Sequence, residues 1–462
     1  MNNAKVRFIT LGCKVNQYET QGMREALEKK GVSNAEAGEG VDFVVINTCT
    51  VTGEADRENR YWIRRARREH PAAKIVVTGC AVERNQREYE TLPGVDLVLR
   101  NHEKADIAAR LFSGCADPEI QSAAAEPEAN PKHRYTPLAI SRSEGRARAF
   151  VKIQDGCNHA CSFCKVVLVR GRSRSRPLQD ILDEVGRLAA SGYKEMVFAG
   201  IQLGAYGLDA GAGYDNAYES EALVKVLRES ARIQGVERLR LSSIEPTDVR
   251  PELIRALREI PKCCPHLHIP LQSGDDETLK RMNRRYGRSF YRDLIARLRS
   301  ELPDFSLTLD VMAGFPGEDE TNFENTARLL EEIEPLKCHV FPYSRREGTR
   351  AAREADLPVE TVRRRVRELI AAGERLGAQV RRSYEGRTMN VLVETRKNES
   401  GLLQGLTANY LKVFFQGSAD WIGEIIPVEF LALQGDIFLG RAWAGSMRTP
   451  QGREEEKHGL VF

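Results

Sequence analysis

The sequence GCNHACSFC, at residues 156–164, carries three cysteines in a C-x3-C-x2-C pattern: Cys157, Cys161 and Cys164. It follows closely on FVKIQ at residues 150–154, a candidate β-strand. Three thiolates so close together can bind three irons of a [4Fe–4S] cluster and leave the fourth iron open for a small molecule. A structural zinc site would need a fourth ligand, and His159 lies at a spacing unusual for zinc. The pattern therefore favours an iron–sulfur cluster.

The chain around this stretch alternates predicted strands with predicted helices. Helical stretches at residues 178–190, 223–233 and 291–302 lie between six strand-like runs, at residues 150–154, 196–199, 239–242, 267–271, 306–311 and 339–341. Six βα units predict a partial version of the eight-fold βα barrel over residues 147–383, ending in an Arg-rich helix. Active sites of such barrels lie at the carboxyl ends of the strands, which is where the cysteine stretch falls.

Three further cysteines, Cys13, Cys49 and Cys80, each follow a strand-like run, in the sequences FITLGC, VVINTC and IVVTGC. Strands at 6–10, 43–47, 75–78 and 96–99, with helices near 17–30, 54–70 and 82–90 between them, predict a parallel-sheet α/β domain over residues 1–113. Parallel strands place their carboxyl ends on one edge of the sheet, so these three thiolates should converge. Independent buried cysteines are the alternative. The repeated structural position favours a second cluster.

The remaining segments differ in composition from these two domains. Residues 114–146 are rich in Ala, Glu, Pro and Ser without periodicity, which is typical of a linker. Five short strands with Gly punctuation predict a small β-barrel over residues 384–448: 389–394, 402–406, 411–415, 425–431 and 437–442. Residues 449–462 are expected to form a frayed tail.

Overall charge does not indicate a partner, because the 462 residues have a formal net charge of only +3. Three segments are nevertheless rich in arginine: residues 57–68, 170–176 and 363–382. Solvated helix faces would explain them, and so would a polyanion partner. No apolar run is long enough to span a membrane, and the N-terminus lacks a signal-peptide core. A cytoplasmic protein without membrane contact is expected, in which the ten cysteines are not disulfide-bonded.

The C-x3-C-x2-C run resembles the signature of the radical S-adenosylmethionine (SAM) superfamily. There the open iron binds SAM, and an electron from the cluster cleaves it to a 5′-deoxyadenosyl radical. Segments AGIQ, SSIEP, IPLQSG and GFPGE follow successive predicted strands and match those that line the SAM pocket in that superfamily. Glycines there let a backbone approach a ligand. The resemblance implies SAM contacts from Phe163, Gly200, Gln202, Ser242, Glu245, Gln272, Gly314 and Gly317.

The order of the three domains is similar to that of the methylthiotransferase family, whose C-terminal β-barrel is the RNA-binding TRAM domain. LGCKVNQYET at residues 11–20 resembles the branch that modifies N6-threonylcarbamoyladenosine beside the tRNA anticodon. The isopentenyladenosine branch typically reads Gly-Cys-Gln-Met-Asn there, and the ribosomal-protein branch Gly-Cys-Pro-Lys-Asn. RGRSRSR at residues 170–176 and HVFPYS at residues 339–344 also match the first branch. One departure is KVVL at residues 165–168, where the family usually has an Ile-Ile-Pro-Tyr-like stretch.

This resemblance implies a tRNA methylthiotransferase with two [4Fe–4S] clusters and SAM. It would form the 2-methylthio derivative of threonylcarbamoyladenosine in the tRNA anticodon loop, as a monomer, with a sulfur donor and an electron donor still to be identified. Arg170, Arg172, Arg174 and Arg176 are expected to contact the RNA, either its phosphates or the substrate carboxylate. Isopentenyladenosine or a ribosomal protein side chain is the alternative substrate. The six intact cysteines argue against a non-catalytic RNA-binding protein.

Overall fold

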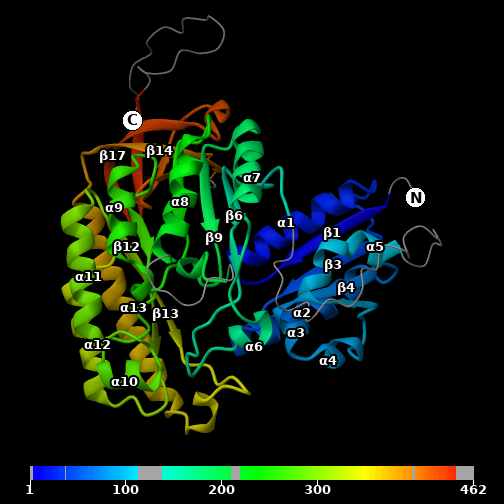
Figure 1. Cartoon of the computed structure of the whole chain (residues 1–462), viewed down its shortest axis with the longest axis horizontal. Helices are drawn as coiled ribbons and strands as arrows, with labels where there is room; N and C mark the ends of the chain where they lie inside the picture. The colour runs from blue at the N-terminus through cyan, green and yellow to red at the C-terminus, as the bar shows by residue number, and fades with distance from the viewer. Residues whose placement is uncertain (1–3, 37, 113–137, 210–218, 398–400, 444–462) are drawn as a thin grey trace, which may run out of the picture.

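The structure is a computed structural model that describes residues 4–36, 38–112, 138–209, 219–397 and 401–443 (Figure 1). An N-terminal α/β domain, a larger βα domain and a C-terminal β-barrel follow one another along the chain. Within these ranges no helix is both long enough and apolar enough to cross a membrane. The mixed α/β fold with a closed C-terminal barrel confirms the fold class predicted from the sequence.

The N-terminal domain is a parallel sheet of five strands in the order β2-β1-β3-β4-β5. Its strands are β1 (Lys5–Thr10), β2 (Ser33–Asn34), β3 (Phe43–Thr48), β4 (Lys74–Gly79) and β5 (Leu97–Leu99). Alternate apolar residues of β3 and β4 enter separate cores on the two faces, as expected when helices cover both sides of a parallel sheet. The edge strand β2 was not predicted from the sequence.

Helices α1 (Lys14–Glu28) and α5 (Ile107–Phe112) cover one face of this sheet. The other face is covered by α2 (Gly53–Glu69), α3 (Cys80–Arg84) and α4 (Gln86–Glu90). The sequence predicted one helix over residues 82–90. The structure instead divides this region at Asn85, whose side chain accepts a hydrogen bond from the Glu88 backbone and so caps a new helix, α4.

Six parallel strands form the partial barrel: β6 (Arg148–Lys152), β9 (Glu195–Ala199), β10 (Arg238–Leu241), β11 (His266–His268), β12 (Ser306–Ala313) and β13 (Lys337–Pro342). Parallel bridges from Leu239 to Cys263 and from Ser243 to His268 join its two three-stranded halves. The outer layer consists of α7 (Leu178–Ala190), α8 (Glu219–Arg232), α9 (Pro251–Glu259), α10 (Asp276–Arg281), α11 (Arg288–Glu301), α12 (Glu320–Ile333) and α13 (Val359–Arg382). A short hairpin of β7 (Gln154–Asp155) and β8 (Arg174–Ser175), with α6 (Val166–Arg170), surrounds the cysteine stretch.

The C-terminal β-barrel closes in the order β14-β15-β16-β18-β17 around its own apolar core. Its strands are β14 (Thr388–Lys397), β15 (Leu403–Thr407), β16 (Lys412–Phe415), β17 (Ile425–Gln434) and β18 (Ile437–Ala442). Arg240 of β10 donates to the backbone oxygens of Ala408 at 2.8 Å and Thr407 at 3.1 Å, and the Tyr410 ring stacks on His266 at 4.3 Å. The small barrel therefore packs against the amino ends of the βα-barrel strands, opposite the cysteine stretch.

Part of the segment expected to be a linker packs against both neighbouring domains. Residues 138–146 lie within the described ranges, and Leu138 and Ile140 are buried. The Tyr18 hydroxyl donates to the Leu138 oxygen at 2.6 Å, and the Ile140 backbone donates to Glu184 at 2.9 Å. These residues therefore connect the N-terminal domain to α7 of the barrel. The earlier part of the expected linker and the expected tail at residues 449–462 lie outside the described residues.

Gly79, the residue before Cys80, packs tightly against β3, and a substitution there tests this packing. Its φ is +106°, and a Cβ there would lie 2.4 Å from the Thr48 backbone oxygen. Gly79→Ala should lower the free energy of unfolding by roughly 2–4 kcal/mol through backbone strain and overpacking. Gly186→Ala, on α7 with nothing within 4 Å of the new Cβ, should be neutral or slightly stabilising. Equal denaturant midpoints for the two variants would contradict this packing.

Candidate active site with two cysteine triads

The N-terminal cysteine triad lies at one edge of the sheet. Cys13 precedes α1, Cys49 follows β3, and Cys80 is the first residue of α3. Gly12, with φ +86°, packs so closely that a Cβ there would lie 2.7 Å from Cys49 Sγ. Burial, with the nearby Cys80 and Cys13 thiols, raises the pKa of Cys49 to about 12. Gly12 therefore packs directly against Cys49, and the convergence of all three thiols on one cluster stays a prediction from the sequence.

The second triad lies in the loop after β7. The Sγ atoms of Cys157 and Cys164 each accept a hydrogen bond from a backbone N–H, of His159 at 3.3 Å and of Val166 at 3.4 Å. Burial raises the pKa of Cys157 to about 12 and that of Cys164 to about 11. Each of these two sulfurs thus has an N–H donor positioned for a thiolate.

Arg284 supplies the corresponding donor to the third cysteine. Its Nη1 lies 3.3 Å from Cys161 Sγ, and its Nη2 donates to Glu245. The Cys157 backbone N–H is itself held by the Gly171 oxygen at 3.0 Å, which fixes the start of the loop. Sequence reasoning missed Arg284, because it lies in NRRYG, a segment with no recognisable motif.

The donor chemistry of both triads fits an iron–sulfur cluster. Within the described ranges, no three His, Cys, Asp or Glu side chains are placed to hold a single metal ion. A cluster binds each thiolate to a different iron, so its sulfurs need not converge on one point. The raised pKa values of the buried thiols mean that their thiolates need a nearby cation, which cluster irons provide. Hydrogen bonds to the sulfurs are of the kind that tune cluster potentials.

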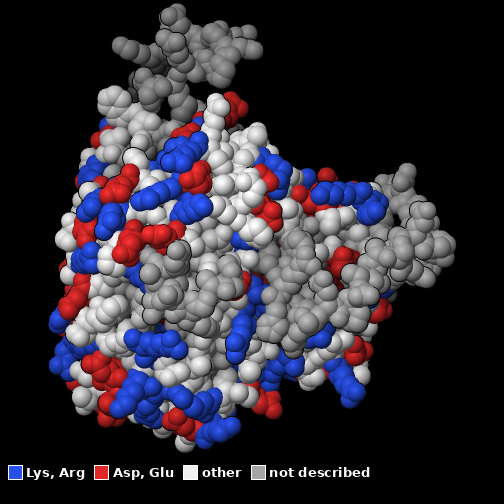
Figure 2. Space-filling view, viewed as in Figure 1, with Lys and Arg blue, Asp and Glu red and all other residues white. Residues whose placement is uncertain are grey.

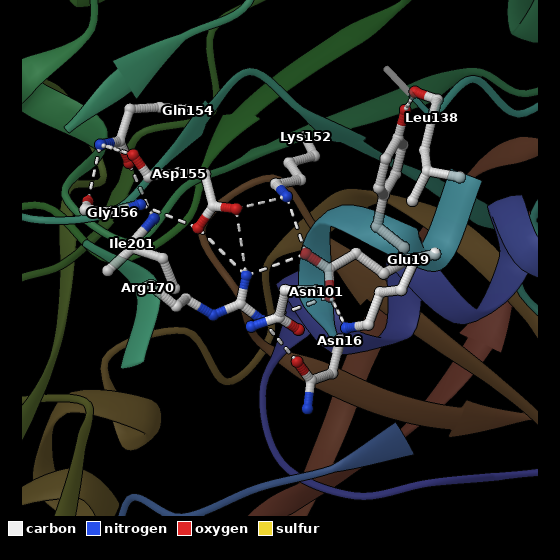
Figure 3. A network of polar contacts seen from close by, with 12 residues as sticks. Asn16, Glu19, Asn101, Leu138, Lys152, Gln154, Asp155, Gly156, Arg170 and Ile201 are labelled. Carbon is white, nitrogen blue, oxygen red and sulfur yellow. Dashed lines mark hydrogen bonds and ion pairs between the residues drawn. The ribbon is translucent and has the colours of Figure 1, made fainter. Parts of the chain in front are cut away.

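The guanidinium of Arg170 is buried among carboxylates from both domains (Figure 3). Helix α6 begins two residues after Cys164 and ends at Arg170, whose side chain is buried. Arg170 Nε donates to Cys80 Sγ at 3.2 Å. Its Nη1 donates to Glu19 at 2.8 Å and to Asp155 at 3.0 Å. A barrel residue therefore completes the surroundings of a cysteine in the N-terminal domain.

Two lysines extend this network. Lys152 Nζ lies 2.7 Å from Glu19 and 2.8 Å from Asp155, and Lys104 also pairs with Glu19. Burial alone would raise the pKa of Glu19, but Arg170, Lys104 and Lys152 hold it well below its usual value. The buried cations outnumber the two carboxylates, so the network presents surplus positive charge beside Cys80. Cys80 as a thiolate ligand of a cluster would carry a negative charge that balances this surplus.

The arginines predicted to contact RNA have different surroundings in the structure. Arg170 is part of the buried network, Arg176 Nη1 donates to Glu184 at 3.0 Å, and Arg174 lies 3.4 Å from Asp155. Arg172 is exposed. Arg174 and Arg176 lie two residues apart, in and just after β8, and both point toward buried carboxylates, whereas Arg172 precedes this strand. The geometry leaves Arg172 as the one of these four that is open to solvent.

Several residues predicted to bind SAM lie at the carboxyl ends of the barrel strands. Gln202 Oε1 accepts a hydrogen bond from the Asn158 backbone at 2.9 Å, so it supports the cysteine loop. Ser242 is buried just past β10. Gln272 has a positive φ of 65°, and its buried Oε1 has no hydrogen-bond partner among the described residues. That oxygen is suited to accept a hydrogen bond from a ligand.

The glycines and Phe163 are packed against protein groups. A Cβ at Gly200 would meet Gln154, one at Gly314 would meet Val362, and one at Gly317 would meet Arg281. The close approaches that require these glycines are therefore to side chains of this chain. Phe163 packs edge-on against Phe315, with ring centroids 6.4 Å apart. SAM contacts by these four residues stay predictions from the resemblance.

The fold and the cysteine loop at the barrel end define a radical SAM enzyme. Residues 151–330 match the model of the radical SAM superfamily, 5–100 that of uncharacterized protein family UPF0004, and 382–430 that of the TRAM domain. The solved structure of the radical SAM methyltransferase TsrM from Kitasatospora setae, with cobalamin and a [4Fe–4S] cluster bound, has a TM-score of 0.52 and 16% identity. The match covers 76% of this chain and 77% of the TsrM chain. At this identity it shows a similar fold and nothing more.

Full-length relatives narrow this class to a family. A threonylcarbamoyladenosine tRNA methylthiotransferase from Bacillus subtilis is 37% identical over 93% of this chain and 94% of its own. A tRNA-2-methylthio-N6-dimethylallyladenosine synthase from Acetivibrio thermocellus is 31% identical over 91% of this chain and 87% of its own. The chain belongs to the radical SAM methylthiotransferase family.

Iron analysis tests the two triads. Anaerobically reconstituted protein should hold about eight irons per chain, and Cys161→Ala and Cys49→Ala should each lose about four, because each triad would hold one cluster. Cys338→Ala is the matched control, since Cys338 packs against Gly373 of α13, outside both triads. Iron retained in the first two variants, or lost equally in the control, would refute the assignment.

Unfolding of the iron-free protein tests the buried network. Arg170→Gln should cost about 3–5 kcal/mol of stability, because Glu19 and Asp155 stay buried without their shared guanidinium. Arg172→Gln, at an exposed site in the same segment, should change stability by no more than about 0.5 kcal/mol. Similar losses in both variants would show that Arg170 does not join the domains as described.

Proposed function

We propose that this protein converts N6-threonylcarbamoyladenosine next to the tRNA anticodon into its 2-methylthio derivative. The observation that carries the proposal is the pairing of two cysteine triads at one domain interface in a chain of this family. The threonylcarbamoyladenosine tRNA methylthiotransferase from Bacillus subtilis is 37% identical to this chain. The dimethylallyladenosine enzyme from Acetivibrio thermocellus is 31% identical to it. The LGCKVN sequence around Cys13 supports the same branch.

The target C2–H bond of adenine has no acidity that a general base could use, so two [4Fe–4S] clusters and SAM would supply radical chemistry and the sulfur. Cys157, Cys161 and Cys164 would hold the cluster that binds SAM, and the N-terminal triad the other. This chain's side chains fix that arrangement. Arg284 and Gln202 hold the cysteine loop, and Arg170 docks the N-terminal triad beside it.

The substrate base must reach both triads, so it would be unstacked from the anticodon loop, the form in which proteins read single-stranded RNA. The TRAM barrel lies at the other end of the strands (Figure 1). Strand β12 has eight residues, about 26 Å in length. The TRAM barrel would therefore contact a part of the tRNA remote from the modified base. The sulfur donor, the electron donor, the monomeric state and a cytoplasmic location stay predictions from the sequence.

Two tRNAs of identical sequence, with and without the threonylcarbamoyl group, test the substrate. The modified tRNA should be converted to the 2-methylthio form and the unmodified tRNA should react poorly, since its adenine lacks the charged substituent. Mass spectrometry of the digested nucleosides measures both products. Equal turnover, or reaction only with isopentenyl-modified tRNA, would overturn the substrate while leaving the radical methylthiotransferase activity intact.

A further inference from the structure

Lys165, the residue that follows Cys164, has an unusual environment. Only 4% of the residue is exposed, and its Nζ is buried without a hydrogen-bond partner among the residues that the structure describes. Buried polar groups in folded proteins nearly always have a partner, because leaving one unmade is costly. The KVVL stretch that departs from the usual family pattern begins at this lysine. Its ammonium group therefore calls for a partner beyond the described residues of this chain.

The surroundings of Lys165 are basic. Arg346, in the loop after β13, donates from Nη2 to Asp56 at 2.7 Å, while its buried Nε has no hydrogen-bond partner within the described ranges. Arg84 of α3 lies 3.5 Å from the same carboxylate and 2.6 Å from Glu347, which is 87% exposed. Asp56, which is partly buried, and Glu347 are the two carboxylates that pair with Arg84 and Arg346, and neither pairs with Lys165. Positive charge is left over at this point of the domain interface.

This basic group lies between the two triads. Lys165 is adjacent to Cys164, and Arg84 is the last residue of the helix that begins with Cys80. Helices α3 and α6 lie side by side in Figure 1, and Figure 2 shows Lys and Arg side chains along that lower edge of the molecule. The loop after β13 also lines a cavity of about 480 Å³, with Arg345, Glu347 and Arg353 among its walls. A substrate base that reaches both triads must come close to this group.

We propose that Lys165 and Arg346 form a binding site for an anionic oxygen of the RNA substrate. A carboxylate or a phosphate would provide the acceptors that Lys165 Nζ and Arg346 Nε lack, and would balance the surplus charge. The threonylcarbamoyl carboxylate and a backbone phosphate of the anticodon loop are the two sources of such an oxygen. The inference rests on the proposed function, since it assumes an anticodon loop at the two triads.

Lys165→Met tests the site, because methionine keeps the length of the side chain and removes its charge. The full-length reconstituted variant is compared with wild type in binding two anticodon stem-loops, one with and one without the threonylcarbamoyl group. Loss of a charge-assisted hydrogen bond should weaken binding by about 10- to 100-fold. If the carboxylate is the ligand, only the modified stem-loop loses affinity. If a phosphate is the ligand, both lose affinity equally.

Two further measurements keep the test decisive. Lys280→Met, at an exposed lysine of α10 that pairs with Glu277, should leave binding of both RNAs unchanged. Lys165→Met should hold full iron and unfold at the same or higher denaturant concentration than wild type, because it removes an unpaired buried amine. Unaltered affinity for both stem-loops in Lys165→Met would overturn the anion site. Wild-type protein that binds both stem-loops alike and never forms product would instead overturn the proposed function.

Discussion

The buried ion network around Arg170 is the interaction on which the two-part site depends. Burying charged groups is costly, so a buried ion network stabilises the fold only where its ions are well paired. Here Glu19 of the N-terminal domain and Asp155 of the barrel share one guanidinium, which also donates to Cys80 Sγ. The same contact that docks the domains therefore also places positive charge beside the N-terminal triad.

The positions of the six cysteines could be predicted from the sequence for a local reason. A cysteine just after a parallel strand lies at the carboxyl edge of its sheet, whatever the rest of the chain does. The inward orientation of Arg170 could not be predicted, because it depends on Glu19, which is 151 residues away in the sequence. That of Arg176 depends on Glu184, which reaches it only once α7 has packed. Glu19 and Arg284 were missed for the same reason, since their partners are brought near only by tertiary packing.

The two ends of the βα barrel contact different parts of the molecule. Arg240, at the amino end, donates to backbone oxygens of the TRAM barrel, whose Tyr410 stacks on His266. The cysteines, Gln202 and Arg284 occupy the carboxyl end. An RNA bound at both ends would lie along the side of the molecule, with its modified base at the cysteine end. Lys165 at that end, whose Nζ has no hydrogen-bond partner among the described residues, fits a chain that keeps a locally unfavourable group where a substrate binds.

The two cysteine triads place their clusters on either side of one interface, between the N-terminal domain and the barrel. Helix α6, which connects the cysteine loop to Arg170, has five residues and is about 7.5 Å long. Two reduced clusters so close should interact magnetically. The direct measurement is electron paramagnetic resonance of the fully reduced protein beside variants that retain only one triad. The wild-type spectrum should be broadened by spin–spin coupling between the two clusters. A wild-type spectrum equal to the sum of the two single-triad spectra would contradict it.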